Sequence, residues 1–228
     1  MLDQGIVESI REMESGTHAV LIYDTQEHKR EVLLRHLREG VGREGLVYAY
    51  YGIDEVSLAE QMKGAGIDVE LLQAAGDLTI KPSEEVYLKG GVMDVGGVIR
   101  GFADLAYGYR RNGKEGIRAG ADMSPILKAD RGPDVVAYEE RLGRKFTFPG
   151  KGICAYDLIA LHNSGELQHL MPIFMAHAMV ILAGPGGYAV RRPDEVERDG
   201  LAGVLRHVIP TRSDDSRRPA GFRLTSSR

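Results

Sequence analysis

The stretch Lys151-Gly-Ile-Cys-Ala-Tyr-Asp157 decides the fold of this chain. It follows Pro149 and Gly150, and residues 153–156 form a short apolar run, a pattern that predicts the start of a buried β-strand. The run ends at Asp157. An acid at the carboxyl end of a buried strand lies where open α/β sheets build ligand sites, and it can equally cap the following helix. The sequence leaves both roles open.

Apolar runs at 18–23, 46–51 and 179–182 predict further strands. So do the alternating stretch 77–81, which Pro82 closes, and 116–122, which again ends on an acid, and 188–190 is expected as an edge strand. Amphipathic segments separate them. The clearest helix spans 92–111, and its sheet-packing face is expected to carry Val95, Ile99, Phe102 and Leu105. Strands that alternate with helices predict an α/β fold with a mostly parallel β-sheet flanked by helices on both faces. The strand near Ile153 is expected at its centre.

Length and composition fit one α/β domain. We expect this domain to occupy residues 1–190 of 228, and residues 191–228 to form a charged, partly disordered tail with a turn or two of helix at 201–209. The pI near 6.0 shows no bias toward nucleic acid. The single cysteine excludes an internal disulfide, and no apolar run reaches membrane-spanning length. The expected location is the cytoplasm, without membrane or direct nucleic-acid contact.

The turn after the first predicted strand argues against a phosphate site. A phosphate-binding loop needs glycines because backbone N–H groups must wrap the phosphates. Residues 24–30 contain no glycine, and Asp24 and Glu27 stand where phosphates bind. Lys29 is interpreted as a solvated helix residue. We therefore expect no nucleotide binding at this turn.

The sequence gives no support for a metal or a cofactor, and neither is predicted. No histidine pair shows the i, i+4 spacing with an intervening Glu that zinc enzymes use on a helix. Cys154 lies inside an apolar strand, where a thiol keeps a high pKa and stays inert as a nucleophile. Whether Cys154 and His177 meet in space, or hold a metal together, remains open.

Polar residues at the carboxyl ends of predicted strands are the candidate ligand site: Tyr23, Asp122, Tyr156 and Asp157. Arg118 lies within a strand and Glu139 on the helix that follows. Because a buried charge needs a partner, we expect Arg118 either to pair with Glu139 or Asp157 or to receive an anionic ligand in bidentate geometry.

Five stretches carry a family resemblance: His18-Ala-Val-Leu-Ile-Tyr23, residues 116–124, 138–142 and 153–157, and His177-Ala-Met-Val-Ile181. In this order, over about residues 15–190, the chain resembles the MEDS domains, the methanogen/methylotroph sensory domains related to RecA/KaiC-like ATPase cores. The resemblance implies a RecA-like fold without a phosphate loop, used as a sensor input.

Carried over position by position, the family's recurring residues fall on His18, Tyr23, Arg118, Asp122, Glu139, Cys154, Tyr156, Asp157 and His177. The chain departs from the family's usual Trp, Asn, Gln and Pro at Pro125, Gly143, Ala155 and Ala178. Pro125 in place of Trp and Ala155 in place of Gln imply a pocket of different shape.

These observations favour a non-enzymatic sensory or regulatory domain. It is expected to bind a small molecule at the carboxyl ends of its strands through Tyr23, Arg118, Asp122, Glu139, Cys154, Tyr156, Asp157 and His177, and to signal through a partner protein. Two alternatives stay open: a degenerate RecA/KaiC-like nucleotide-binding protein or ATPase, and a ligand-free interaction scaffold. A homo-oligomer is also an open alternative.

Overall fold

The computed structural model describes residues 2–129 and 131–209. Its sheet has the order β3-β2-β4-β5-β1-β6-β7, and every pairing is parallel except that of β6 with β7. The predicted α/β class is confirmed, the arrangement is RecA-like, and β5 lies at the centre of the sheet. The strands are β1 (His18–Tyr23), β2 (Gly45–Tyr50), β3 (Leu78–Pro82), β4 (Ile117–Asp122), β5 (Gly150–Asp157), β6 (Met179–Gly184) and β7 (Gly187–Arg191).

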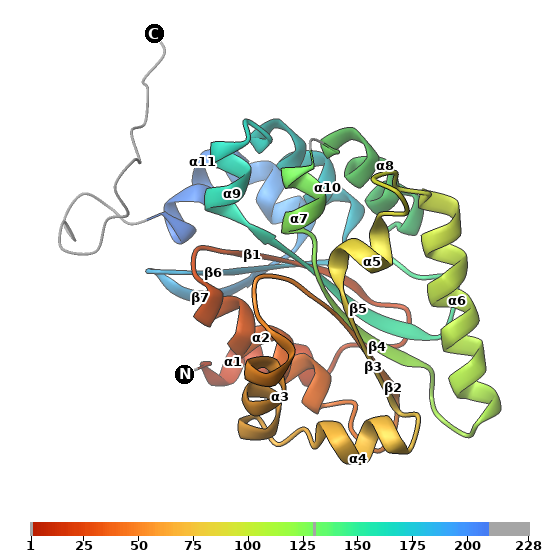
Figure 1. The fold of residues 1–228 in the computed structure, drawn as a ribbon. Coiled ribbons are helices and arrows are strands. Elements are labelled where there is room, and N and C mark those ends of the chain that lie inside the picture. Colours follow the sequence, from red (N-terminus) through yellow and green to blue (C-terminus); the bar gives the residue numbers. More distant parts are fainter. Residues whose placement is uncertain (1, 130, 210–228) are drawn as a thin grey trace, which may run out of the picture.

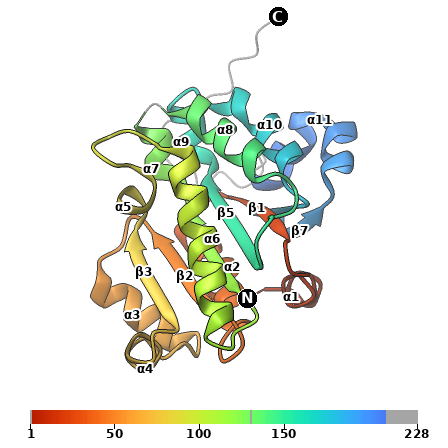
Figure 2. The same cartoon turned by 90° about the vertical axis from the view of Figure 1, so that its right-hand side faces the viewer.

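The helices cover both faces of the sheet. Figure 1 shows α1 to α4 below it and α7 to α11 above it, and Figure 2 shows α6 running alongside the strands. The lower layer contains α1 (Gln4–Arg11), α2 (Gln26–Arg38), α3 (Glu55–Gly64) and α4 (Val69–Ala74). The other helices are α5 (Ser83–Tyr87), α6 (Val95–Arg111), α7 (Ser124–Lys128), α8 (Gly132–Leu142), α9 (Leu158–Asn163), α10 (Leu170–Ala176) and α11 (Pro193–Val208).

Each face of the sheet has its own apolar core, because successive side chains of a strand point to opposite faces. Val20, Ile22 and Cys154 pack with α5 to α11, whereas Leu21, Tyr23 and Ile153 pack with α1 to α4. Both faces of β1 are therefore buried, as in parallel sheets generally, and its sequence is a continuous apolar run after His18.

The C-terminal helix is longer than the sequence predicts. Only a turn or two was expected at 201–209, whereas α11 spans Pro193–Val208 with a kink at Gly200, where φ is +66°. Val196, Val204 and Val208 are buried in the core above the sheet. The division of the chain at residue 190 stays a prediction, and the expected disorder of 210–228 lies outside the described residues.

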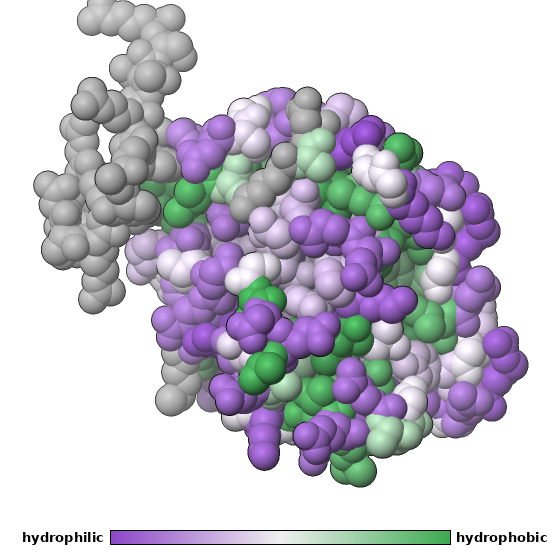
Figure 3. Space-filling model, viewed as in Figure 1, coloured by the Kyte–Doolittle hydropathy of each residue, from purple (hydrophilic) through white to green (hydrophobic). Residues whose placement is uncertain are grey.

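The surface is mostly hydrophilic in the view of Figure 3, with apolar residues in separate places. The exposed large apolar residues include Val56 on α3 and Leu71 on α4. Over the part of the chain that the structure describes, no helix combines the length and the apolar character needed to cross a membrane.

Helix α6 shows where the predicted packing face is right and where it is wrong. Phe102, Ala106 and Tyr109 are buried at i, i+4 and i+7, and Val95 and Ile99 pack partly against the same core. Leu105 was expected on this face but is 38% exposed, because the buried stripe follows Phe102 and Ala106 and leaves Leu105 at its border.

Two alanine substitutions on α6 test this assignment. Phe102→Ala removes a buried ring and is expected to lower the free energy of unfolding by about 3–5 kcal/mol. Leu105→Ala, one turn further along the same helix, should cost less than about 1 kcal/mol because Leu105 is partly solvated. Urea unfolding of both variants measures the difference. Equal losses, or a larger loss for Leu105→Ala, contradict the assignment.

Candidate functional site

The predicted site residues lie in three separate places. Tyr23, Asp122 and Asp157 lie at the carboxyl ends of β1, β4 and β5, as predicted. Glu139, Cys154, Tyr156 and His177 join His18 in the core above the sheet. Arg118 lies near the amino end of β4 and faces α2, with Asp122 four residues further on the same side of the strand. A single site at the strand ends therefore does not include all eight residues.

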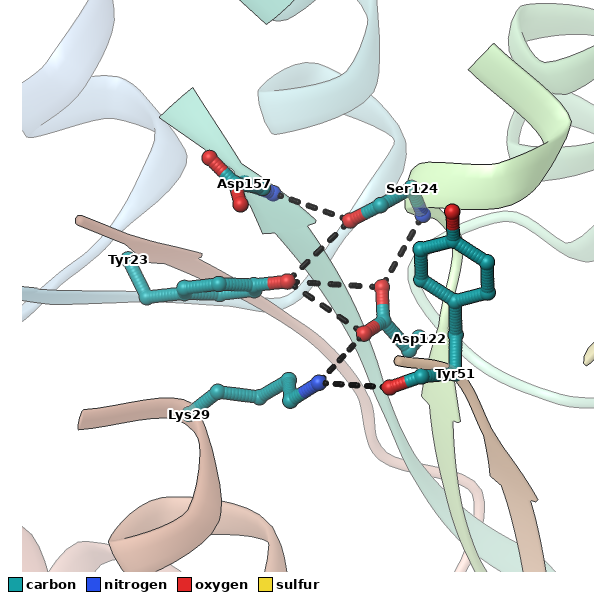
Figure 4. Close-up of polar contacts among 6 residues, drawn as sticks. All are labelled: Tyr23, Lys29, Tyr51, Asp122, Ser124 and Asp157. Carbon is teal, nitrogen blue, oxygen red and sulfur yellow. Dashed lines mark hydrogen bonds and ion pairs between the residues drawn. The ribbon is translucent and has the colours of Figure 1, made fainter. Parts of the chain in front are cut away.

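At the carboxyl ends, Asp122 is the centre of a polar network (Figure 4). Lys29 Nζ on α2 donates to Asp122 Oδ2 at 2.6 Å and to the Tyr51 carbonyl at 3.3 Å. The Tyr23 hydroxyl lies 3.4 and 3.3 Å from the two carboxylate oxygens and 3.1 Å from Ser124 Oγ. The backbone N–H of Ser124 donates to Asp122 Oδ1 at 3.0 Å.

Burial makes these contacts obligatory for the charged groups. Asp122 is fully buried and Lys29 is 5% exposed, so the prediction that Lys29 is a solvated helix residue is wrong. Lys29 lies on the apolar stripe of α2 with Val32, Leu33 and His36, at the spacing of a buried helix face. Burial, and then the charge of Asp122, raises the pKa of the Tyr23 hydroxyl, which keeps it neutral.

Asp157 has the capping role that the sequence left open. Its carboxylate accepts hydrogen bonds from the backbone N–H groups of Ile159 and Ala160, both at 2.9 Å, at the start of α9. Its own backbone N–H lies 3.4 Å from Ser124 Oγ and so joins the network (Figure 4). The network thus ties the ends of β1, β4 and β5 together.

An open hollow adjoins this network between α2, α3 and the carboxyl end of β2. Its cavity volume is about 490 Å³. Its lining contains polar side chains from Lys29, Arg30, Gln26, Gln61 and Ser57. The remaining lining residues are Tyr48, Tyr51, Gly52, Ile53, Asp54 and Leu58. Lys29 belongs both to the hollow and to the buried network.

On the other face of the sheet, His18, Glu139, Cys154 and His177 form a fully enclosed polar cluster, here called the core cluster. Each residue offers one atom of a type that can bind a metal, and these four atoms lie within 4.8 Å of one another. Glu139 Oε2 lies 3.2 Å from His18 Nε2 and 3.6 Å from His177 Nε2, and His18 Nε2 lies 3.5 Å from Cys154 Sγ. The Tyr156 hydroxyl donates to the other carboxylate oxygen, Glu139 Oε1. Cys154 and His177 thus do meet in space.

The protonation of the core cluster follows from burial and from its own hydrogen bonds. Burial raises the pKa of the Glu139 carboxyl, but His177, His18 and the Tyr156 hydroxyl together lower it below its ordinary value. Burial, with His18 next, lowers the pKa of His177 to about 3. Burial and then Glu139 raise the pKa of the Cys154 thiol well above its usual 9.0, so free Cys154 is a thiol.

Arg118 is the one predicted residue whose partners were wrong. Neither Glu139 nor Asp157 contacts it; Arg118 Nε donates to Glu44 Oε2 at 2.5 Å and Nη1 donates to the His36 carbonyl at 3.3 Å. Lys151 Nζ lies 3.1 Å from Glu44 Oε1. Glu44 precedes β2, which is the direct neighbour of β4, and this adjacency is not visible in the sequence. Arg118 is fully buried and lines neither the hollow nor the core cluster.

The comparisons with known proteins give one finding. A family model described as MEthanogen/methylotroph, DcmR Sensory domain (MEDS) matches residues 17–171, more than half of the chain. The match contains the strand-end network, the hollow and every core-cluster residue except His177. A comparison with curated proteins gives no match.

Replacement of Arg118 tests whether it has a structural role. Arg118→Met leaves the buried Glu44 carboxylate with Lys151 alone and is expected to lower the free energy of unfolding by roughly 3–5 kcal/mol. Arg100→Met removes an arginine whose side chain is 71% exposed and should cost less than about 1 kcal/mol. Chemical unfolding at fixed ionic strength measures both. A loss for Arg118→Met no larger than for Arg100→Met shows that the pair is dispensable.

His36 makes this part of the fold sensitive to acid. Burial, with Arg118 next, lowers the pKa of His36 well below its ordinary 6.5, and Lys151 acts in the same direction. Below about pH 6.5 the unfolded chain binds a proton at His36 that the folded chain does not, so stability falls as pH decreases toward the folded pKa.

His36→Asn keeps a hydrogen-bonding side chain but removes this titration. We expect the variant to lose stability less steeply than the wild type between about pH 6.5 and pH 5, since one full proton corresponds to ~1.4 kcal/mol per pH unit. Unfolding free energies measured along this pH series give the two slopes. Identical slopes contradict the prediction.

Proposed function

This chain belongs to the MEDS family, the methanogen/methylotroph sensory domains, and from this premise we propose that it is a non-enzymatic sensory domain whose small-molecule ligand binds in the hollow at the carboxyl ends of its strands. The resemblance predicted from the sequence is confirmed by the family match. The position of Lys29 supports this site, because Lys29 lines the hollow and its Nζ also donates to Oδ2 of the buried Asp122 at 2.6 Å.

The lining of the hollow favours a small polar or anionic ligand. Lys29 and Arg30 bring two positive charges, and Gln26, Gln61 and Ser57 bring neutral groups that can donate and accept hydrogen bonds. Asp54, the acid of the lining, is already engaged as the cap of α3 and accepts hydrogen bonds from Ser57 N at 2.9 Å and Ser57 Oγ at 2.7 Å. A carboxylate or phosphate group therefore finds its best partners at the α2 wall.

Occupation of the hollow acts on the strand-end network through Lys29. An anion that binds Lys29 competes with Asp122 for the same ammonium group. Asp122 also accepts from Ser124 N, and Ser124 Oγ contacts both Tyr23 and Asp157 N. A change at Lys29 is therefore passed to the starts of α7 and α9, from which a partner protein reads the state of the domain.

The same geometry argues against a nucleotide. β1 ends at Tyr23 and α2 begins at Gln26, so two residues connect them, and Thr25 uses its side chain to cap α2 at His28 N. This connection is too short for the loop of N–H groups that surrounds a triphosphate. Lys29, on the first helix after β1, is paired with Asp122.

A thermal-shift screen of the full chain against small carboxylates, phosphates and neutral polar molecules tests the proposal. Compounds that raise the melting temperature of the wild type should lose most of this effect in Lys29→Met/Asp122→Asn. The double substitution removes both charges of the buried pair, so neither is left unpaired in the core. Lys63→Met, an exposed lysine of α3 outside the hollow, is the matched control and should respond as the wild type does.

Magnesium ATP is the comparison compound and should give no shift and no hydrolysis. Stabilising compounds that act equally on the wild type and on the double variant exclude the hollow as the binding site. ATP hydrolysis that depends on Asp122 excludes a purely sensory role.

A further inference from the structure

We propose that the core cluster is a metal site in which His18, Glu139, Cys154 and His177 bind one Zn²⁺ ion. The inference goes beyond the sensory ligand of the hollow and does not rest on it. It starts from the position of four side chains of metal-binding type, contributed by β1, α8, β5 and the C-cap residue of α10. Cys154 is 5% exposed and the other three are completely buried.

The histidine tautomers leave both facing nitrogens with lone pairs. His18 Nδ1 lies 2.8 Å from the Gly143 carbonyl oxygen, and His177 Nδ1 lies 2.6 Å from the Ile173 carbonyl oxygen. A carbonyl only accepts hydrogen bonds, so each Nδ1 carries a hydrogen and donates it. In a neutral imidazole the other nitrogen, Nε2, then offers a lone pair, and both Nε2 atoms face Glu139 Oε2.

A cation between these groups would relieve the repulsion between His177 Nε2 and Glu139 Oε2, whereas the Cys154 thiol has one hydrogen to donate and its hydrogen-bond partner is His18 Nε2. Two lone-pair nitrogens and a carboxylate oxygen face one another in the buried core. Within the described residues, His177 Nε2 and Glu139 Oε2 are buried and have no hydrogen-bond partner. Buried polar atoms without partners are costly, and an ion bound between them is one of the recognised reasons for them.

The surrounding contacts match those that orient metal ligands in proteins. Metal-binding histidines usually donate their second ring N–H to a backbone carbonyl or a carboxylate, as His18 and His177 do here. Glu139 is oriented in the same way, because Tyr156 holds Oε1 and leaves Oε2 directed at the two imidazoles. The Phe146 ring packs against His18 with 4.8 Å between ring centroids and adds an apolar wall.

Donor type, distance and charge together select zinc. Two imidazole nitrogens, a thiolate and a carboxylate are all zinc ligands, with bonds of about 2.0–2.3 Å, which place neighbouring ligand atoms of a tetrahedron about 3.3–3.8 Å apart. The observed separations of 3.2, 3.5 and 3.6 Å lie in or near this range, and the widest pair, within 4.8 Å, must close by about 1 Å. One Zn²⁺ with one carboxylate and one thiolate is neutral overall, so binding removes the isolated anion from the core.

Binding of Zn²⁺ releases one proton. Zn²⁺ enters as the cation, the Cys154 thiol loses its hydrogen to solvent, and the thiolate sulfur bonds to the metal. The two imidazoles bind through Nε2 as neutral rings, and Glu139 binds as the carboxylate. Nothing is oxidised or reduced. With four protein ligands the site is closed, which is the pattern of structural rather than catalytic zinc.

Cobalt substitution in the tag-free full chain tests the proposal, because Co²⁺ takes the place of Zn²⁺ and has a visible spectrum. Metal is first removed with a chelator, and Co²⁺ is then titrated. We expect saturation at about one ion per chain, visible bands of tetrahedral Co²⁺ and a near-ultraviolet sulfur-to-cobalt band, all lost when Zn²⁺ is added. Because Cys154 is the single cysteine, any sulfur-to-cobalt band assigns that ligand without a variant.

Substitutions distinguish metal binding by these four ligands from nonspecific metal binding elsewhere on the chain. Cys154→Ser should lose the sulfur-to-cobalt band, and His177→Gln should bind Zn²⁺ at least tenfold more weakly. His28→Gln, a partly exposed histidine of α2, should match the wild type in both respects. Zn²⁺ should also raise the melting temperature of the metal-free wild type. No sulfur-to-cobalt band in the wild type, or a binding stoichiometry well below one, overturns the proposal whether or not the variants fold.

Discussion

The ion pair between Lys29 and Asp122 is the contact on which the carboxyl edge of this fold depends. Both groups are buried, and breaking such a pair leaves an uncompensated charge that costs about 3–5 kcal/mol. The pair joins α2 to the end of β4 across the edge of the sheet where related folds bind phosphates. The chain therefore keeps the scaffold of a phosphate-binding fold, but its lysine ammonium group is paired with the carboxylate of Asp122 instead of a phosphate.

The same constraint acts at two further places in the core. Arg118 requires Glu44, and the carboxylate of Glu139 requires Tyr156 and the imidazoles beside it. Asp122 and Arg118 lie on the α2 side of the sheet but at opposite ends of β4, and Glu139 lies on the other side, so the three groups do not compensate one another. A sheet with charged residues on both faces can remain buried only if every charge has a local partner, and this explains why polar residues interrupt strands that are otherwise apolar.

The strands could be predicted because their signal is local. His18–Tyr23 is a continuous apolar run bounded by turn residues, and it forms β1 without a shift of either end. The partners of buried charged residues could not be predicted in this way. Glu44 contacts Arg118 only because β2 and β4 are neighbours, and strand order is a property of the whole chain. Burial of Lys29 does have a local signal, because Val32, Leu33 and His36 follow it on α2 at the 3, 4, 7 spacing of a buried helix face.

The strand-end network and the core cluster lie on different faces of the sheet but share β1 and β5. His18 and Tyr23 are the two ends of β1, and Cys154 and Asp157 lie three residues apart on β5. In the proposed metal-bound state, the core cluster would fix β1, β5 and α8 to one another, so these elements would not shift when the proposed ligand enters the hollow. Movement is then confined to groups that are not fixed in this way: Lys29 on α2, the α3 wall, and the turns after β4 and β5. A sensor needs such a division between a rigid body and a part that has two arrangements.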